Sequence, residues 1–513
     1  MSRNTVVFII FLIVVSILFT LIDYNHFPFS DGAEHGAAVR ALAKNLIHPG
    51  DPMLHAVSGA SPRYVPSIFI MALFMKVSGL DVLVVLKLFE VAGLAFFLIS
   101  AALFCKEYFR DRRQAPWSIA CLLFLWGLGW NGANAYMFSA ILYTAYYPSV
   151  ISFSLAFLAL YFQLRFLRSE RRAFLAGALL SGAICFVNHP LTGTFFFICS
   201  GLLYLEREGL NKKALSCYTL SIITALCLTV LWPYYNFFAS LMTIASGEMK
   251  KTIDYSLTQQ YLYSKPLLRS GAALAGIPIA IYYLMQGRYV LLWGGSLLFG
   301  LLYLYGFYST ISLAERCIFF MLCLLQIAAS RLCRGWSAKN VWTSQHLGNK
   351  IFFSFLVFLL VGGIAIQAAL VFKEFIAPSF SFAAGAAFPR YVNPNAMQHE
   401  LKKYLHDGDV VLSEIYSSWF VPVYTGAKIV ALFHTAPHVK DNIQRIADVQ
   451  AFYNVATPNS ARNEILKKYS VTHVFLNFKI NGKKIEPILV GNGYRAIVRT
   501  ELFCIFSVPI SEG

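Results

Sequence analysis

The sequence predicts a polytopic α-helical membrane protein with about eleven transmembrane helices, the N-terminus inside, the C-terminus outside, and a C-terminal extracytoplasmic α/β domain. Of the 513 residues, 58% are apolar and 13% are charged, against about 45–50% and about 25% in soluble domains. The apolar residues gather in long runs, and a membrane helix needs roughly 20 such residues. From about residue 373 the composition turns polar. The mean hydropathy of +0.61 excludes disorder and a purely soluble enzyme.

The apolar runs define the predicted spans. We predict membrane helices at 5–24, 81–105, 116–131, 148–166, 173–188, 190–205, 215–234, 270–286, 289–307, 311–330 and 350–372. The first run is expected to be a retained anchor, because Arg3 precedes it and no small-residue cleavage site follows. The run 65–80 is apolar but short. If it crossed the membrane, the basic loop 106–113 would lie outside, so we expect a helix on the outer membrane surface.

The positions of the basic residues predict the orientation in the membrane and argue against a nucleic acid partner. The net charge of +17 lies mostly in short loops after the even-numbered spans, as expected for loops on the cytoplasmic side. A stripe of basic and aromatic residues on a soluble face is missing, so we expect no nucleic acid partner. Nine of the ten cysteines lie in or beside apolar runs, and no CxxC pair occurs. A disulfide framework and a zinc finger are therefore not implied.

The polar segments fall outside the predicted membrane. The predicted transmembrane domain, 1–372, has two long outer loops, 25–64 and 235–269. In the second domain, 373–513, helical patterns alternate with apolar strand patterns, which indicates an α/β layered domain. No GxGxxG follows a strand, so the fingerprint of a nucleotide site is absent. Helices are expected at 393–407, 439–454 and 459–470, and strands at 409–415, 428–433, 472–478, 494–500 and 502–508.

The first outer loop holds the best candidate for chemistry. In DGAEH, the residues Asp31, Glu34 and His35 are spaced i, i+3 and i+4, which places two carboxylates and an imidazole on one helix face. A carboxylate at the membrane surface can act as a general base on an incoming hydroxyl. The same spacing of Asp31 and Glu34 is also a capping-box pattern that merely starts a helix. The local pattern leaves both interpretations open.

Three further residues are candidates for binding a phosphate: Arg63, Arg316 and His189. Arginine suits bidentate phosphate binding and stays charged. Arg63 precedes the surface helix, Arg316 lies at the outer end of the tenth span, and His189 lies in the tight outer turn NHPLTG. The alternatives are a snorkelling cation and a hydrogen-bonded turn residue. Supporting roles are expected for Arg40, Tyr64 and Glu315.

Five features carry a family resemblance: the acidic helix start DGAEH after the first span, the surface helix VPSIFIMALF with the later basic turn KEYFRDRR, the outer turn NHPLTG, the outer loop before the eighth span, and the external α/β domain with VPVYTGAKIVALFH and ILKKYSVTHVFLN. Together they resemble the GT-C superfamily of integral membrane glycosyltransferases, which includes aminoarabinose transferases and protein O-mannosyltransferases.

The resemblance implies the reaction. A sugar would move, with inversion, from a polyprenyl-phosphate donor to a lipid, glycan or protein acceptor at the outer face of the membrane. Asp31 would be the base, with Glu34 or His35 assisting. DGAEH departs from the paired acids of the family, so either Asp31 or Glu34 remains open as the base. The DxD-like pair that would support a divalent cation is missing, and no cofactor is certain.

The resemblance also implies a bacterial inner membrane, with the site and the C-terminal domain facing the periplasm or exterior. Two other functions remain open. The first is a membrane transporter or lipid flippase, although paired halves of the kind found in transporters are not evident. The second is a non-catalytic recognition protein with the same fold.

Overall fold

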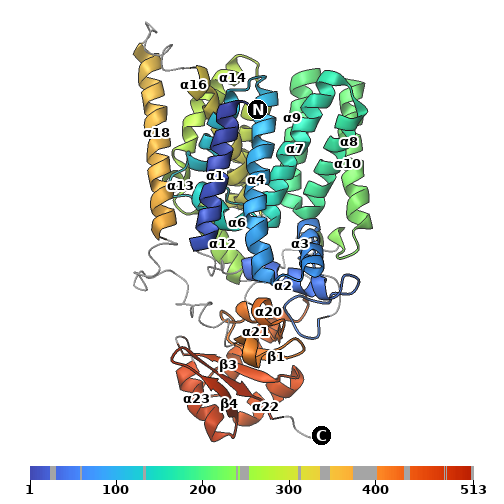
Figure 1. Ribbon diagram of the computed structural model, residues 1–513, viewed down its shortest axis with the longest axis vertical. Coiled ribbons are helices and arrows are strands. Elements are labelled where there is room, and N and C mark those ends of the chain that lie inside the picture. Colours follow the sequence, from blue (N-terminus) through green and yellow to red (C-terminus); the bar gives the residue numbers. More distant parts are fainter. Residues whose placement is uncertain are drawn as a thin grey trace.

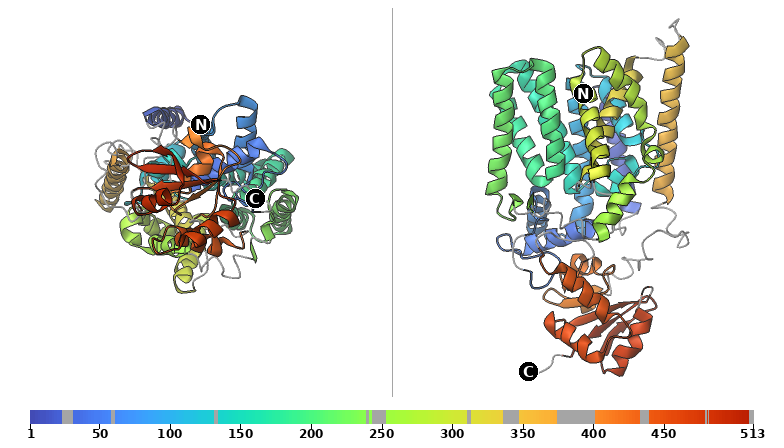
Figure 2. Two further views of the ribbon diagram at one scale, coloured as in Figure 1. Left: turned by 90° about the horizontal axis from the view of Figure 1, so that it is seen from below. Right: turned by 180° about the vertical axis from the view of Figure 1, so that it is seen from behind.

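The structure is a helical bundle with a small α/β domain at one end. The computed structural model describes residues 1–22, 31–57, 61–130, 134–238, 241–242, 253–309, 313–335, 347–373, 401–432, 439–478, 480 and 482–509. In Figure 1 the bundle helices run nearly parallel to one another, and the N-terminus lies at the end opposite the C-terminal domain. Figure 2 shows from below that this domain covers the middle of the bundle.

Each predicted span contains a helix. The bundle helices are α1 (Arg3–Ile22), α4 (Val82–Tyr108), α5 (Gln114–Phe124), α7 (Pro148–Ser169), α8 (Arg172–Asn188), α9 (Pro190–Glu208), α10 (Lys212–Leu231), α14 (Ile277–Met285), α15 (Val290–Ser309), α16 (Cys317–Gly335) and α18 (Leu347–Val371). Within the described residues, six helices are long and apolar enough to cross a membrane: α1, α4, α7, α10, α15 and α18. The chain is thus an integral membrane protein, and the count of eleven crossings stays a prediction.

Two predicted spans are interrupted. The span 116–131 ends as a helix at Phe124, and the chain then unwinds. There, the backbone N–H groups of Gly127 and Gly129 donate to the carbonyl of Arg269 at 3.0 and 2.9 Å. A Cβ on Gly127 would lie 2.1 Å from the carbonyl oxygen of Leu268, so this approach requires glycine. The span 270–286 is likewise divided into a 3₁₀ turn, η2 (Ala273–Gly276), and α14.

Several short helices surround the bundle. The second outer loop forms α12 (Ile253–Tyr263) and α13 (Pro266–Ser270), while 243–252 lie outside the described residues. The helix α6 (Phe138–Thr144) precedes α7, and the 3₁₀ turn η3 (Ala314–Arg316) precedes α16. At the end of the bundle that faces the C-terminal domain lie α2 (Asp31–Lys44) and α3 (Pro66–Ser78), as Figure 1 shows.

The helix α3 corresponds to the run expected on the membrane surface. Its bounds follow from the sequence, because Pro66 fits the first turn and Gly79 ends the helix in the left-handed region at φ 68°. Its 13 residues are fewer than a crossing needs. One face packs on the protein through Ile68 and Met71. The location of α3 on the membrane surface stays a prediction.

The C-terminal domain is built on a mixed five-stranded sheet. The strand order is β2-β1-β3-β5-β4, in which β1 pairs in parallel with β2 and β3, and β5 pairs antiparallel with β3 and β4. The strands are β1 (Val410–Ser413), β2 (Lys428–Ile429), β3 (His473–Asn477), β4 (Arg495–Arg499) and β5 (Phe503–Ser507), and the helices are α20 (Phe420–Thr425), α21 (Asn442–Phe452), α22 (Asn459–Lys468) and α23 (Gly482–Gly491).

The sequence patterns located most of this domain. All five strands lie within the predicted ranges, as do α21 and α22. The short helices α20 and α23 were not predicted, since one has only six residues and the other contains Pro487. Most of the helix expected at 393–407 lies outside the described residues, and 401–404 are helical.

The first outer loop is joined to the C-terminal domain. Leu54 pairs in parallel with Ile429 of β2. The N–H of Ile429 donates to the carbonyl of Met53 at 2.9 Å, and the N–H of His55 donates to the carbonyl of Ile429 at 3.0 Å. One continuous hydrophobic core extends from α2 and α3 into the sheet. The first outer loop therefore fixes the C-terminal domain against the bundle.

Candidate active site

The first turns of α2 bring two carboxylates to one arginine. The predicted helix face is present, because α2 starts at Asp31. Arg63, which lies just before α3, places Nη1 3.8 Å from Oδ1 of Asp31 and also forms an ion pair with Glu34. The loop that links α2 to α3 thus returns Arg63 to the start of α2. The sequence predicts these residues at one level of the membrane. In the structure, Arg63 contacts both Asp31 and Glu34.

The two carboxylates differ in their surroundings. The Glu34 side chain is 2% exposed, whereas that of Asp31 is 22% exposed. Glu34 also accepts a hydrogen bond from Nε1 of Trp419 at 3.2 Å. Trp419 directly precedes α20, so the C-terminal domain contributes a side chain to the site. Arg63 and Trp419 thus hold Glu34 in the interior, and Asp31 is the more accessible carboxylate.

His35 and the start of α7 form one wall of the site. The ring of His35 is buried and meets the ring of Tyr147 edge-on, with centroids 5.0 Å apart. Tyr147 precedes α7, where Pro148 occupies the first turn. His35 therefore packs into the base of the site, although it lies on the same helix as Asp31.

His189 lies in the turn between α8 and α9 and caps α9. Its Nδ1 accepts from the N–H of Thr192 at 3.3 Å, which assigns the ring proton of the neutral imidazole to Nε2. The turn is tight, because a Cβ on Gly193 would lie 2.5 Å from the Cα of Phe186. The pKa of His189 is lowered to about 3, chiefly by burial and also by the charges of Arg316 and His35, while the charge of Asp31 opposes them. His189 is therefore a neutral hydrogen-bond donor, close enough to Asp31 and Arg316 for their charges to shift its pKa.

This depressed pKa predicts a pH-dependent stability. An unfolded histidine binds a proton below pH of about 6.5, but folded His189 resists it, so stability falls as the pH drops from 6.5 toward 3. Because the ring is partly exposed, we expect a loss of about 1 kcal/mol at pH 5. The melting temperature of His189→Gln, measured from pH 7.5 to 4.5, should fall less than that of the wild type. Parallel curves for the two proteins would contradict the assignment.

Arg316 is linked to His189 through two residues that the sequence did not single out. Its Nη1 donates to Oδ1 of Asn134 at 3.4 Å, and Nδ2 of Asn134 donates to Oγ1 of Thr192 at 3.3 Å. The Thr192 hydroxyl lies 2.8 Å from Nδ1 of His189. This series of hydrogen bonds fixes the position of Arg316 beside the α8–α9 turn. Asn134 has a left-handed φ of 79°, which asparagine tolerates better than most residues and which would have been a weak local signal.

Asn188 is a second residue that the sequence analysis missed. Its Oδ1 accepts from the N–H of Ser67 at 2.8 Å, and its Nδ2 donates to the carbonyl of Pro148 at 2.8 Å and to the Ser152 hydroxyl at 2.9 Å. These bonds join the end of α8 to the starts of α3 and α7. Asn188 thus positions the elements that carry Arg63 and Tyr147.

The expected supporting residues take separate places. Tyr64 is fully buried, and its hydroxyl donates to the carbonyl of Gly50 at 2.7 Å, which closes the first outer loop. Glu315 is fully buried in η3 next to Arg316. Arg40 lies on the far side of α2, nine residues after Asp31. The structure therefore does not bring Arg40 together with the carboxylates.

Arg40 instead holds the C-terminal domain. Its Nε donates to the carbonyl of Val423 at 3.1 Å and its Nη2 donates to that of Tyr424 at 3.3 Å, at the end of α20. A cation is favourable at a helix C-terminus. We expect Arg40→Ala to destabilise the docking by about 1–3 kcal/mol, seen as faster hydrogen exchange in α20. Arg495→Ala, at an exposed residue of β4, is the matched control. Equal exchange in both variants would contradict this role.

The described residues do not gather a metal site. Among them, no group of three or more His, Cys, Asp and Glu side chains lies close enough to hold an ion. Asp31 and Glu34 both face the guanidinium of Arg63.

Comparison with known proteins supplies structural neighbours. Neither a protein-family model nor a curated protein matches the sequence. The structure is similar to ArnT from Cupriavidus metallidurans, with 11% identity and a TM-score of 0.58 over 99% of this chain and 98% of that one. It is similar to the Archaeoglobus fulgidus oligosaccharyltransferase, with 11% identity and a TM-score of 0.55 over 92% and 69%.

A third neighbour is the mycobacterial arabinofuranosyltransferase AftD, with 13% identity and a TM-score of 0.62 over 100% of this chain and 42% of that one. At these identities the likeness establishes the fold. The resemblance found in the sequence is confirmed at that level, and the chain has the fold of the GT-C membrane glycosyltransferases.

Proposed function

We propose that the chain is an inverting glycosyltransferase that moves a sugar from a polyprenyl-phosphate donor to a lipid, glycan or protein acceptor at the outer face of the membrane. The observation that supports it is the accessible carboxylate of Asp31 beside Arg63, at the end of a GT-C-like bundle. One neighbour, the Archaeoglobus fulgidus AglB, was solved with a dolichol-phosphate and an inhibitory peptide. A lipid phosphate and a separate acceptor suit the same arrangement here.

The proposed reaction is a single displacement. The acceptor oxygen or nitrogen attacks the anomeric carbon and forms the new bond, while the bond from that carbon to the donor phosphate breaks. Its electron pair goes to the phosphate oxygen, and polyprenyl phosphate leaves. The carboxylate of Asp31 takes the acceptor's proton. Attack opposite the leaving group inverts the anomeric configuration.

The charged groups have distinct roles in this scheme. Arg316 and the Nε2–H of His189 are offered as donors to the departing phosphate, since fixed donors stabilise developing negative charge. Arg63 forms ion pairs with both Asp31 and Glu34, so its main role here is to orient the base. Its guanidinium has less hydrogen-bonding capacity left for the donor phosphate. Glu34 is a positioning residue in this proposal, because Trp419 and Arg63 already occupy its oxygens.

The test is turnover by the purified full chain. The protein in detergent is offered a panel of short polyprenyl-phosphate sugars, with Arg316→Ala as a second sample. Release of polyprenyl phosphate with an inverted sugar product, lost in Arg316→Ala, would support the proposal. Donor binding without release across the panel would favour a recognition protein. Movement of the lipid only in sealed vesicles would favour a flippase, since transport needs a closed membrane.

In a cell we propose that this site and the C-terminal domain face the periplasm or exterior of a bacterial inner membrane. The N-terminus at the opposite end of the bundle and the basic loops predicted inside support this orientation.

A further inference from the structure

A cavity separate from the candidate active site lies between the end of α2, the end of α3 and the C-terminal domain. Its volume is about 640 Å³, within the usual range of small-molecule sites. Arg40 and Lys44 line it from α2, which places it about 14–20 Å along the helix from Asp31 at 1.5 Å per residue. Lys76 lines it from the last turn of α3, and Lys428 from β2.

The lining is strongly basic. Four cations, Arg40, Lys44, Lys76 and Lys428, face one carboxylate, Asp407, among the lining residues that the structure describes. Lys44 forms an ion pair with Asp407. The helices α2 and α3 both end at this cavity. The dipole of each helix places only about half a negative charge at its C-terminus. Outside the lining, Asp81 lies 3.9 Å from Nη2 of Arg40 and forms an ion pair with it. Lys76 and Lys428 are therefore the lining cations that have no ion pair within the described part of the chain.

Lys428 is the most constrained of these cations. Its Nζ donates to the carbonyls of Asp51 and Pro52 at 2.6 and 3.2 Å, which are neutral partners. Burial lowers its pKa, and the charges of Asp51 and Asp407 only partly oppose this. A cation out of water and without a paired carboxylate is stabilised by an anion in the adjoining space.

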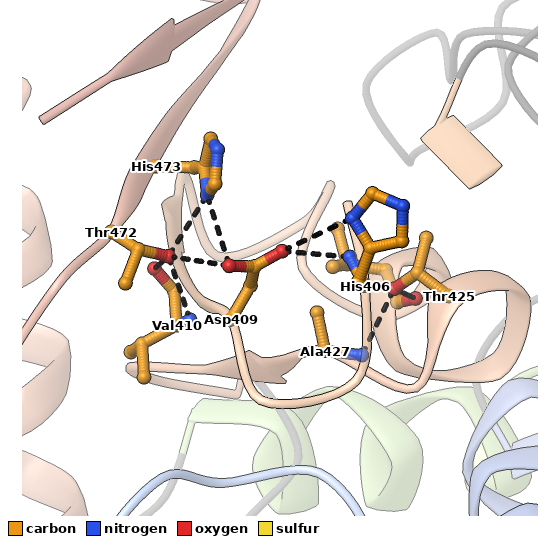
Figure 3. Close-up of polar contacts among 8 residues, drawn as sticks. His406, Asp409, Val410, Thr425, Ala427, Thr472 and His473 are labelled. Carbon is orange, nitrogen blue, oxygen red and sulfur yellow. Dashed lines mark hydrogen bonds and ion pairs between the residues drawn. The ribbon is translucent and has the colours of Figure 1, made fainter. Parts of the chain in front are cut away.

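Asp409, which precedes β1, is not part of the cavity lining. Figure 3 shows it between His406 and His473. Its oxygens accept from the N–H of His406 at 2.7 Å and from the Thr472 hydroxyl at 3.3 Å, and Nδ1 of His473 lies 3.6 Å away. Asp409 thus belongs to the start of the sheet, and no ion pair joins it to Lys76 or Lys428 within the described residues.

The exposed face of α3 beside the cavity is apolar. Four exposed side chains, Ile70, Leu73, Phe74 and Val77, are spaced i, i+3, i+4 and i+7, which forms one stripe along the helix. Val77 is 81% exposed. An apolar stripe next to a basic end is the pattern of a helix that lies in a membrane interface, with its cations at the level of the headgroups.

We propose that this cavity binds the phosphate headgroup of an anionic membrane lipid whose acyl chains lie along the exposed stripe of α3. Lys76 and Lys428 would pair with the phosphate from two different elements, one in the bundle and one in the C-terminal domain. The bound lipid would then join these two parts at a point remote from Asp31. The proposal does not depend on the proposed transferase activity.

The test measures lipid binding by the whole 513-residue chain with native mass spectrometry. Detergent-purified protein is titrated with short-chain phosphatidylglycerol, with phosphatidylcholine of the same chain length, and with inorganic phosphate. We expect retention of phosphatidylglycerol over phosphatidylcholine. Lys428→Gln should weaken this binding about tenfold and Lys76→Gln about threefold. Asp407→Asn should strengthen it, because the cavity loses its lining carboxylate.

The controls separate this site from general charge effects. Lys467→Gln removes an exposed cation of α22 and should leave the binding unchanged. Since Lys428→Gln also removes two hydrogen bonds, its melting temperature is compared with that of the wild type; Lys76→Gln loses no hydrogen bond or ion pair seen in the described residues and carries the test if Lys428→Gln unfolds. Equal retention of both lipids, or unchanged binding in Lys76→Gln, overturns the proposal. Inorganic phosphate that displaces the lipid at equal concentration would overturn the lipid assignment.

Discussion

Asp31→Asn is expected to lower kcat by about 10²–10⁴-fold, the usual contribution of a general base, while the protein stays folded. Asparagine matches aspartate in shape but cannot take the acceptor's proton. The substitution nearly conserves the volume of the side chain, so it leaves no cavity beside Arg63. The measurement is turnover of a polyprenyl-phosphate sugar under saturating donor, together with the melting temperature of both proteins. The donor's dissociation constant should change much less than kcat.

Glu34→Gln is the matched variant, because it changes the other carboxylate of the same helix face. Glutamine can still accept from Nε1 of Trp419, so the site keeps that hydrogen bond. We expect a smaller loss of kcat than in Asp31→Asn, and a pH–rate profile that retains its acidic limb, the fall in rate at low pH where the base becomes protonated. The assignment of the base is reversed if Glu34→Gln loses that limb and Asp31→Asn turns over like the wild type.

The local patterns of the sequence located the helices well. A membrane helix is a run of apolar residues about 20 long, and its signal is contained in its own residues. Likewise, the i, i+3, i+4 spacing placed Asp31, Glu34 and His35 on one helix. The predicted span 116–131 was too long, because a tertiary contact sets the backbone conformation there. After Phe124 the chain leaves the helix, since the N–H of Gly127 donates to the carbonyl of Arg269.

The partners of the candidate residues were beyond those patterns. Trp419 lies 385 residues from Glu34, and Val423 lies 383 residues from Arg40. Such contacts depend on how the C-terminal domain docks, and a pattern limited to a few turns of helix carries no information on docking. Asn134 was missed for the same reason, since its link to Arg316 spans 182 residues. The local patterns supplied candidate residues for chemistry, and the structure adds the residues that contact those candidates.

Arg63→Ala is expected to cause the largest loss of stability, about 3–5 kcal/mol, the usual effect of removing one partner of a buried ion pair. The Arg63 side chain is only 24% exposed and lies between Asp31 and Glu34. Without it, the 2% exposed Glu34 would be a buried anion that has lost its ion pair and keeps the hydrogen bond from Trp419. The free energy of unfolding, measured by denaturant titration in a fixed detergent, reports this loss.

A double variant separates the lost charge from the lost packing. In Arg63→Ala/Glu34→Gln the buried carboxylate is neutral, so most of the desolvation penalty disappears. We therefore expect the double variant to be more stable than Arg63→Ala, although it carries one more substitution. Arg63→Lys, which keeps a charge without the planar fork, should lie between them and the wild type. If the double variant is less stable than Arg63→Ala, the arginine stabilises the site by packing, and the ion pair is not the reason that α2 and α3 meet here.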